Sequence, residues 1–148
     1  MLKLPPPIWG LIYLIVAGAA SALYPWHAIV DLRVIWLGAL LIVLGFALSF
    51  SAAMLFRRKG TELNPTSEAN KVLVIGGPFR FTRNPMYVGL VIFTLGIAFC
   101  VGSLPMFAVP FLVFATANWV HIPFEEAKMR RQFGASFDDY TRQVRRWI

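Results

Sequence analysis

Four long runs of apolar residues constrain this chain more than any other feature of its sequence. They cover residues 8–24, 34–56, 86–104 and 106–122, and none of them contains Asp, Glu, Lys or Arg. Each run approaches the ~20 residues that a helix needs to cross a ~30 Å hydrocarbon layer. Lipid cannot hydrogen-bond to the backbone, so segments that face it must be helical. The sequence therefore predicts an all-α integral membrane bundle of four transmembrane helices.

The composition of the chain agrees with a membrane protein. Its 148 residues are 58% hydrophobic and 14% charged, whereas soluble domains carry about 25% charged residues. We expect residues 1–148 to form a single membrane domain. The net charge of +7 comes from residues that flank the apolar runs, where Lys and Arg bind anionic headgroups. We therefore expect membrane lipids, and no nucleic acid, as partners of the charged segments.

The distribution of basic residues predicts the orientation in the membrane. Residues 57–85 and 124–147 carry most of the Lys and Arg, whereas the connections on the other side carry Arg33 alone. By the positive-inside rule, the cytosolic side holds both termini and the 57–85 loop. We expect an integral protein of a prokaryotic cytoplasmic membrane. The first run of 17 residues is long for the apolar core of a signal peptide, so we expect a retained helix.

Residues 124–147 are predicted to form short C-terminal helices on the cytosolic side. Pro123 is expected to end the fourth transmembrane helix, because proline cannot donate a backbone hydrogen bond. One helix would cover residues 124–133 and end at Gly134, and a second would run from an N-cap at Ser136 toward Trp147. Their apolar stripe could lie on the membrane or cover a pocket; it consists of Phe133, Phe137, Tyr140 and Val144.

Two segments contain residues suited to chemistry. The loop that precedes the third run is longer than a connector needs to be, and its Arg80 and Arg83 could bind a carboxylate or phosphate. An interfacial loop with arginines at the headgroups would have the same composition. Glu125 and Glu126 follow the fourth run. They either stabilise a helix N-terminus, or one binds a ligand's ammonium or hydroxyl groups while the other orients Arg83.

Two further polar residues lie at the end of the fourth run. His121 precedes Glu125 by four residues, a spacing found in metal sites, but the sequence has no second histidine nearby. We therefore expect no metal. Asn118 is a polar side chain within a span, and we expect it to hydrogen-bond to another helix or to line a cavity.

Residues 77–89, GPFRFTRNPMYVG, resemble the signature of the isoprenylcysteine carboxyl methyltransferase family, which is similar to the phospholipid methyltransferases. In that superfamily an Arg-His-Pro-x-Tyr core is followed, one helical hairpin later, by Glu-Glu, Phe-Gly and Tyr. The matching residues here are Glu125-Glu126, Phe133-Gly134 and Tyr140. The resemblance covers residues 71–147, about half of the chain, and two linked motifs in the same order make it specific.

The resemblance implies a membrane methyltransferase that uses S-adenosylmethionine and needs no metal. Its substrate would be a lipophilic small molecule or lipid that enters from the bilayer. Arg83 and Glu125 would be the catalytic residues, near the reacting centre. The cofactor would be bound by Lys71, Val72, Leu73, Val74, Phe79, Asn84, Pro85, Met86, Tyr87 and Glu126.

Two departures from the family pattern bear on the substrate. Asn84 stands where the family has His, although its amide can still hydrogen-bond to a ligand. The related carboxyl methyltransferases have an arginine shortly before Glu-Glu, thought to hold the substrate carboxylate, whereas residues 120–124 here contain none. The sequence therefore argues against a prenylcysteine carboxylate as the substrate.

Two other functions remain open at this level. A membrane reductase of the sterol-reductase type has a similar C-terminal architecture. Its nicotinamide cofactor is larger, however, and its binding would require a longer C-terminal segment than the 26 residues that follow Ile122. A four-helix transporter or non-catalytic membrane protein is the other. Transporters of this size usually place a carboxylate within a span, and the four runs contain none.

Overall fold

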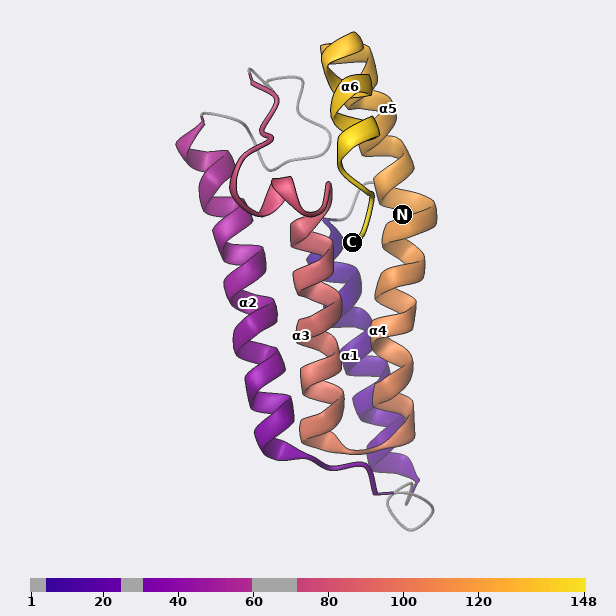
Figure 1. Cartoon of the computed structure of the whole chain (residues 1–148). Helices are drawn as coiled ribbons and strands as arrows, with labels where there is room; N and C mark the ends of the chain where they lie inside the picture. The colour runs from indigo at the N-terminus through magenta and orange to yellow at the C-terminus, as the bar shows by residue number, and fades with distance from the viewer. Residues whose placement is uncertain (1–4, 25–30, 60–71) are drawn as a thin grey trace.

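The computed structural model describes residues 5–24, 31–59 and 72–148, which fold as a helical bundle (Figure 1). The described residues form helices and no strand, so the prediction of an all-α membrane bundle is confirmed. The elements are α1 (Pro6–Leu23), α2 (Ile35–Arg58), the short 3-10 helix η2 (Gly77–Arg80), α3 (Pro85–Val101), α4 (Leu104–Thr116), the π-helical turn η3 (Ala117–His121), α5 (Ile122–Phe133) and α6 (Ala135–Gln143).

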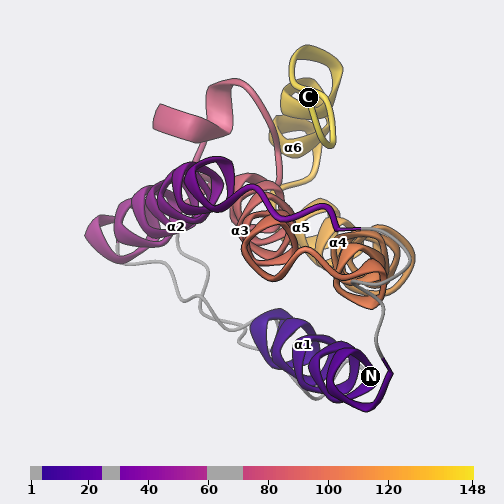
Figure 2. The same ribbon diagram turned by 90° about the horizontal axis from the view of Figure 1, so that it is seen from below.

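Among the described residues, three helices are long and apolar enough to cross a membrane, and a fourth apolar helix is shorter. The long ones are α1, α2 and the continuous helix of residues 104–133, whereas α3 has 17 residues. At 1.5 Å per residue, α3 extends over roughly 25 Å, which lies at the lower limit for a span. Its central place between α2 and α4 (Figure 2) makes it part of the membrane bundle.

Helix α1 is attached to the side of the bundle formed by α4 (Figure 2). Two pairs of hydroxyl groups link the helices along their length. Tyr13 Oη lies 2.7 Å from Thr116 Oγ1, and Ser21 Oγ lies 2.6 Å from Ser103 Oγ. Hydroxyl pairs of this kind hold helices together in lipid, where apolar contacts alone provide little preference. α1 therefore packs on α4, and α2 packs on the opposite side of α3.

Glycines allow α2 and α3 to touch along their backbones. A Cβ atom at Gly38 would lie 2.7 Å from the carbonyl oxygen of Gly96, and one at Gly45 would lie 2.5 Å from that of Gly89. Both distances are shorter than a real Cβ contact, so each position requires glycine. The two pairs are spaced by two helical turns, as small residues often are at interfaces between membrane helices. The α2–α3 contact is consequently rigid and close.

The fourth transmembrane helix continues through Pro123, so the prediction that it ends there is wrong. The N–H of Ile122 donates to the carbonyl of Ala117, a bond across five residues that makes a π-helical turn. We attribute the continuation to this wider turn, which directly precedes the proline and accommodates its missing donor. The result is one helix of 30 residues, from Leu104 to Phe133.

This long helix extends beyond the hydrocarbon layer. Thirty residues cover about 45 Å, compared with a core of about 30 Å. The apolar part ends at Ile122, and the first carboxylates follow at Glu125 and Glu126. The membrane-crossing part therefore corresponds to residues 104–122, and α5 projects from the membrane.

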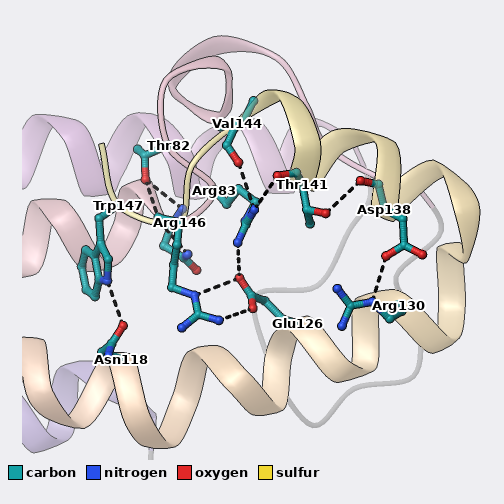
Figure 3. A network of polar contacts seen from close by, with 11 residues as sticks. Thr82, Arg83, Asn118, Glu126, Arg130, Asp138, Thr141, Val144, Arg146 and Trp147 are labelled. Carbon is teal, nitrogen blue, oxygen red and sulfur yellow. Dashed lines mark hydrogen bonds and ion pairs between the residues drawn. The ribbon is translucent and has the colours of Figure 1, made fainter.

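The C-terminal segment also differs from its prediction. Helix α6 begins at Ala135 after Gly134 and ends at Gln143, where the sequence predicted a start at Ser136 and an end near Trp147. The chain leaves α6 at Val144 in an extended conformation and returns alongside α5 and the start of α3 (Figures 1 and 3). We call residues 144–147 the C-terminal strap.

Candidate active site

A cavity of about 600 Å³ lies at the end of the bundle where α3 begins. That volume is typical of small-molecule sites. Its lining comes from the starts of α1 and α3, the second half of α2, the loop before α3, α5 and α6. Segments at both ends of the chain therefore contribute to one site.

The predicted site residues converge on this cavity. Those that line it are Val72, Leu73, Val74, Phe79, Arg83, Asn84, Pro85, Met86, Tyr87, Glu125 and Glu126. Lys71 lies outside the described residues. Arg80, the other arginine considered for anion binding, is exposed and lies outside the lining. Their roles toward a ligand stay predictions.

The loop before α3 is fixed from both sides. Phe79 is buried against α2, where its ring meets that of Phe56 edge-on at a centroid distance of 5.0 Å. From α6, the hydroxyl of Tyr140 donates to the carbonyl of Phe79 at 2.7 Å. Burial raises the pKa of Tyr140 to about 12, so the phenol remains a donor at neutral pH. Of the predicted C-terminal stripe, Phe137 and Tyr140 line the cavity.

The residues that precede α3 are bonded to the strap. The backbone N–H of Arg83 donates to the carbonyl of Arg145 at 3.0 Å. Thr82 Oγ1 and Asn84 Nδ2 both donate to the carbonyl of Arg146, at 3.1 Å and 2.9 Å. Asn84, at the position of the family's histidine, thus uses its amide to hold the strap.

Arg83 and Arg146 enclose Glu126 (Figure 3). Arg83 Nη2 lies 2.8 Å from Glu126 Oε1, and Arg146 Nη2 lies 2.6 Å from Oε2. Arg146 Nε makes a second bond, to Oε1 at 3.2 Å. Arg83 Nη1 donates to the carbonyls of Thr141 and Val144, each at 3.0 Å. The guanidinium of Arg83 therefore joins α5 to the strap.

This network keeps Glu126 ionised. Burial alone would raise the pKa of the carboxyl, but hydrogen bonds from Arg146 and Arg83, together with their positive charges, lower it below its usual value. Charge-assisted bonds of this kind are stronger than neutral ones. Glu126 is consequently a fixed anion whose two oxygens are both held by arginine.

Glu125 has a different environment from its neighbour. Its Oε1 accepts a hydrogen bond of 2.6 Å from the hydroxyl of Tyr87, a neutral group. Burial raises the pKa of Glu125 to about 7, although the bond from Tyr87 and the charge of Lys128 oppose the shift. Burial disfavours the charged form of a carboxyl, and a neutral donor compensates only in part. The carboxyl of Glu125 can therefore gain or lose a proton near neutral pH.

His121 and Asn118, the two polar residues at the end of the fourth apolar run, contact the site and the strap respectively. His121 is buried, and its ring stacks on that of Tyr87 at a centroid distance of 6.4 Å. Its Nε2 has no hydrogen-bond partner within the part of the chain that the structure describes. Asn118 Oδ1 accepts a bond of 3.0 Å from Trp147 Nε1, so its partner lies in the strap and not in another helix as expected. Through this bond Trp147 attaches the strap to the long helix.

Much of the remaining lining forms an apolar wall. We use this name for a set of lining residues with apolar side chains, namely Pro5, Pro6, Pro7, Phe46, Phe50, Phe56, Leu90 and Phe93. They come from α1, α2 and α3, three helices of the membrane bundle. The apolar runs of α1 and α2 predicted spans, and nothing in their spacing indicated which side chains would meet a cavity.

Arg146 is the main site residue that the sequence analysis missed. It is one of two adjacent arginines near the C-terminus, and positive charge there is already explained by the membrane surface. The sequence offered one indication of its role: Arg146 is a cation in the same C-terminal region as the adjacent carboxylates Glu125 and Glu126.

A family model described as phospholipid methyltransferase matches residues 33–136. The matched region contains α2 to α5 and therefore both segments that supply Arg83 and the glutamate pair. No match was found among curated proteins.

Proposed function

Since this chain belongs to the phospholipid methyltransferase family, we propose that it transfers a methyl group from S-adenosylmethionine to a lipophilic acceptor. The membrane bundle and the family support a membrane methyltransferase. Our proposal adds the identity of the methyl donor and the lipophilic character of the acceptor.

The observation that carries the proposal is the joining of two environments in one cavity. At one end lie Asn84, Glu125 and Glu126; Glu125, which the arginine pair does not hold, has a carboxyl that suits the ammonium or hydroxyl groups of a nucleoside. At the other end lies the apolar wall, contributed by membrane helices. A polar donor and an apolar acceptor could meet there, each in the environment that solvates it.

The polar groups of the cavity fit a nucleoside that carries a positive charge. When bound, S-adenosylmethionine would supply an electrophilic methyl group on a positively charged sulfur. Glu125 offers a carboxyl that is not enclosed by the arginine pair holding Glu126, and a carboxylate attracts a neighbouring cation strongly where water is excluded. Holding both reactants in line would account for much of the rate, since positioning can contribute about 7–11 kcal/mol in ideal cases.

We assign different roles to the two residues named as catalytic. Glu125 would contact the reacting groups, since its carboxyl faces the cavity and can change protonation state. Arg83 would act by holding Glu126, α6 and the strap, because its guanidinium is committed to them through three hydrogen bonds. Val72, Leu73, Val74, Phe79, Pro85, Met86 and Tyr87 would enclose the nucleoside.

We further propose that the cavity faces the cytoplasm. The end of the bundle that bears it also carries the basic residues of α5 and α6, such as Arg130 and Arg142. By the positive-inside rule, such an end remains on the cytosolic side of the membrane. A water-soluble donor would then reach the cavity from the cytosol.

Binding and transfer can be tested with the purified protein in detergent. By calorimetry we expect S-adenosylhomocysteine to bind with a dissociation constant in the micromolar range and NADPH to give no heat above dilution. With radiolabelled S-adenosylmethionine and a membrane lipid extract, we expect label in the organic phase. Binding of NADPH without S-adenosylhomocysteine would instead support a nicotinamide-dependent reductase. Binding of neither would contradict an enzymatic function.

A further inference from the structure

The two adjacent glutamates of α5 differ in what holds them. Glu126 is paired with two guanidinium groups at 2.8 Å and 2.6 Å. Glu125 receives its hydrogen bond from the phenol of Tyr87, a neutral donor, at 2.6 Å. Both carboxyls line the same cavity. The same site therefore contains one carboxylate, Glu126, whose charge is neutralised by arginines, and a second carboxyl, Glu125, that can interact with a ligand.

The groups around Glu125 determine its charge in the absence of a ligand. Tyr87 approaches it from α3, with His121 stacked on the phenol ring. Lys128 and Glu126 act from α5 itself with opposite signs. Burial is the largest influence and favours the neutral acid, and the resulting pKa of about 7 makes this carboxyl about half protonated at neutral pH.

We propose that Glu125 is a charge-responsive group, which ionises when the cationic methyl donor enters the cavity and takes up a proton when methyl transfer removes that positive charge. The inference rests on the proposed function, because it assumes that the ligand is a sulfonium. It adds to that function a coupling between the charge of the ligand and the protonation of one named side chain.

The electrostatics of a buried pair account for the coupling. A cation within about 4–6 Å of a carboxyl lowers its pKa by about 1–3 units. At pH 6 to 7 Glu125 would therefore lose its proton on binding a sulfonium, and it would keep the proton on binding a neutral thioether of the same shape. The protein would bind the donor and the product with affinities that depend differently on pH.

The transfer step balances without any further reactant. The bond between sulfur and the methyl carbon breaks with its electron pair moving to sulfur, while a lone pair of the acceptor heteroatom forms the new bond to carbon. The proton that the acceptor gives up passes to Glu125, whose basicity rises as the neighbouring cation disappears. The positive charge lost from sulfur and the negative charge lost from Glu125 cancel, so the transfer leaves the net charge of the cavity unchanged. Acceptors that carry a removable proton on the attacking atom fit this scheme.

Proton-linked calorimetry tests the proposal on the protein in detergent. Titrations at pH 6 in two buffers with different ionisation enthalpies measure the protons released on binding. We expect S-adenosylmethionine to release between half a proton and one proton more than S-adenosylhomocysteine. The two ligands share their amino-acid part, so its protonation cancels in the difference. We also expect the affinity for S-adenosylmethionine, relative to S-adenosylhomocysteine, to rise by roughly five- to fiftyfold between pH 5 and pH 7.

Variants identify the group that releases the proton. Glu125→Gln should abolish the difference between the ligands. Tyr87→Phe removes the hydrogen bond to Glu125 and should shift the pH dependence of affinity to higher pH, because the phenol stabilises the carboxylate. Asp139→Asn is the matched control: it removes one carboxylate on α6 whose side chain is 66% exposed, and the difference should persist.

The outcomes separate the inference from the function on which it rests. Equal proton release by the two ligands, or a difference that persists in Glu125→Gln, would overturn the charge-responsive role and leave the methyltransferase assignment intact. If neither ligand binds, both proposals fail. The comparison of the two ligands in the unmodified protein remains decisive even when Glu125→Gln does not fold.

Discussion

The two ends of the cavity are built on different principles. The end beside α5 is a polar network in which the strap, the residues before α3 and Glu126 are joined by hydrogen bonds and ion pairs of 2.6–3.2 Å. The apolar wall has shape but no such bonds, and Phe46 and Phe50 are more than half exposed. Directional bonds specify one arrangement, whereas an apolar surface accepts many ligands of suitable size. We infer that the polar end is sensitive to substitution and that the wall is tolerant.

The largest effect is expected from Glu126→Ala. This change leaves two arginines without their anion in a region where the side chains of Glu126 and Arg83 are only 14% and 13% exposed. Breaking a buried pair by removing one partner costs about 3–5 kcal/mol. We expect a clearly lower Tm in detergent and loss of S-adenosylhomocysteine binding.

The matched control for that variant is Asp138→Ala. It removes the ion pair with Arg130, whose two side chains are 43% and 56% exposed, and exposed pairs contribute at most about 1 kcal/mol. A Tm for Glu126→Ala equal to that of Asp138→Ala would show that the polar end does not depend on its central carboxylate.

Glu125→Gln should change how stability depends on pH. Because folding raises the pKa of Glu125 to about 7, its protonated form stabilises the folded state fully below about pH 4.5. This contribution is lost as the pH rises through 7, and it amounts to at most about 3 kcal/mol. Between pH 5 and pH 7.5 the unmodified protein should therefore lose thermal stability relative to Glu125→Gln. Parallel curves would show that Glu125 titrates normally.

A smaller effect is expected at the attachment of the strap. Trp147→Phe removes the hydrogen bond to Asn118 and keeps most of the ring contact with Phe114, whose centroid lies 4.5 Å away. The loss of one such bond costs about 0.5–1.5 kcal/mol. We expect a modest decrease in Tm with faster amide exchange in residues 144–147. Unchanged exchange there would mean that Arg83 and Asn84 hold the strap without Trp147.

The smallest effect on the fold is expected at the wall. Phe50 is 54% exposed, so Phe50→Ala should change stability by about 0.5 kcal/mol or less. The same variant should bind S-adenosylhomocysteine normally and raise the KM for a lipophilic acceptor. A weaker affinity for S-adenosylhomocysteine in this variant would place the nucleoside against the wall and contradict the division between the two ends.

The same division explains how much could be predicted from sequence. The bundle follows from uncharged runs of sufficient length, because lipid leaves a helix as the only way to satisfy their backbone. The segments that supply Arg83 and Glu125 were identified by residue types that suit chemistry and by their resemblance to a family motif. The resemblance also implied that these segments meet, because residues of both were expected to bind one cofactor, and the folded chain brings them to one cavity.

What sequence reasoning missed depends on partners that are distant in the chain. Pro123 is a helix breaker by its own chemistry, and only the π-helical turn before it explains why the helix continues. Trp147 near an apolar boundary is typical of an interfacial anchor, a role that does not indicate the bond from its indole to Asn118. Arg146 could pair with any of several carboxylates, and the choice of Glu126 comes from the path of the strap.

The glycine contact between α2 and α3 has a consequence for the cavity. Gly45 lines the cavity at the point where a side chain would collide with the carbonyl of Gly89. This part of the lining is therefore main chain, which has no rotamers to exchange. Side chains elsewhere around the cavity can adjust to an acceptor, but here the distance between two backbones sets a fixed boundary. Even one added methyl group would have to separate the helices before it altered the space that a ligand can occupy.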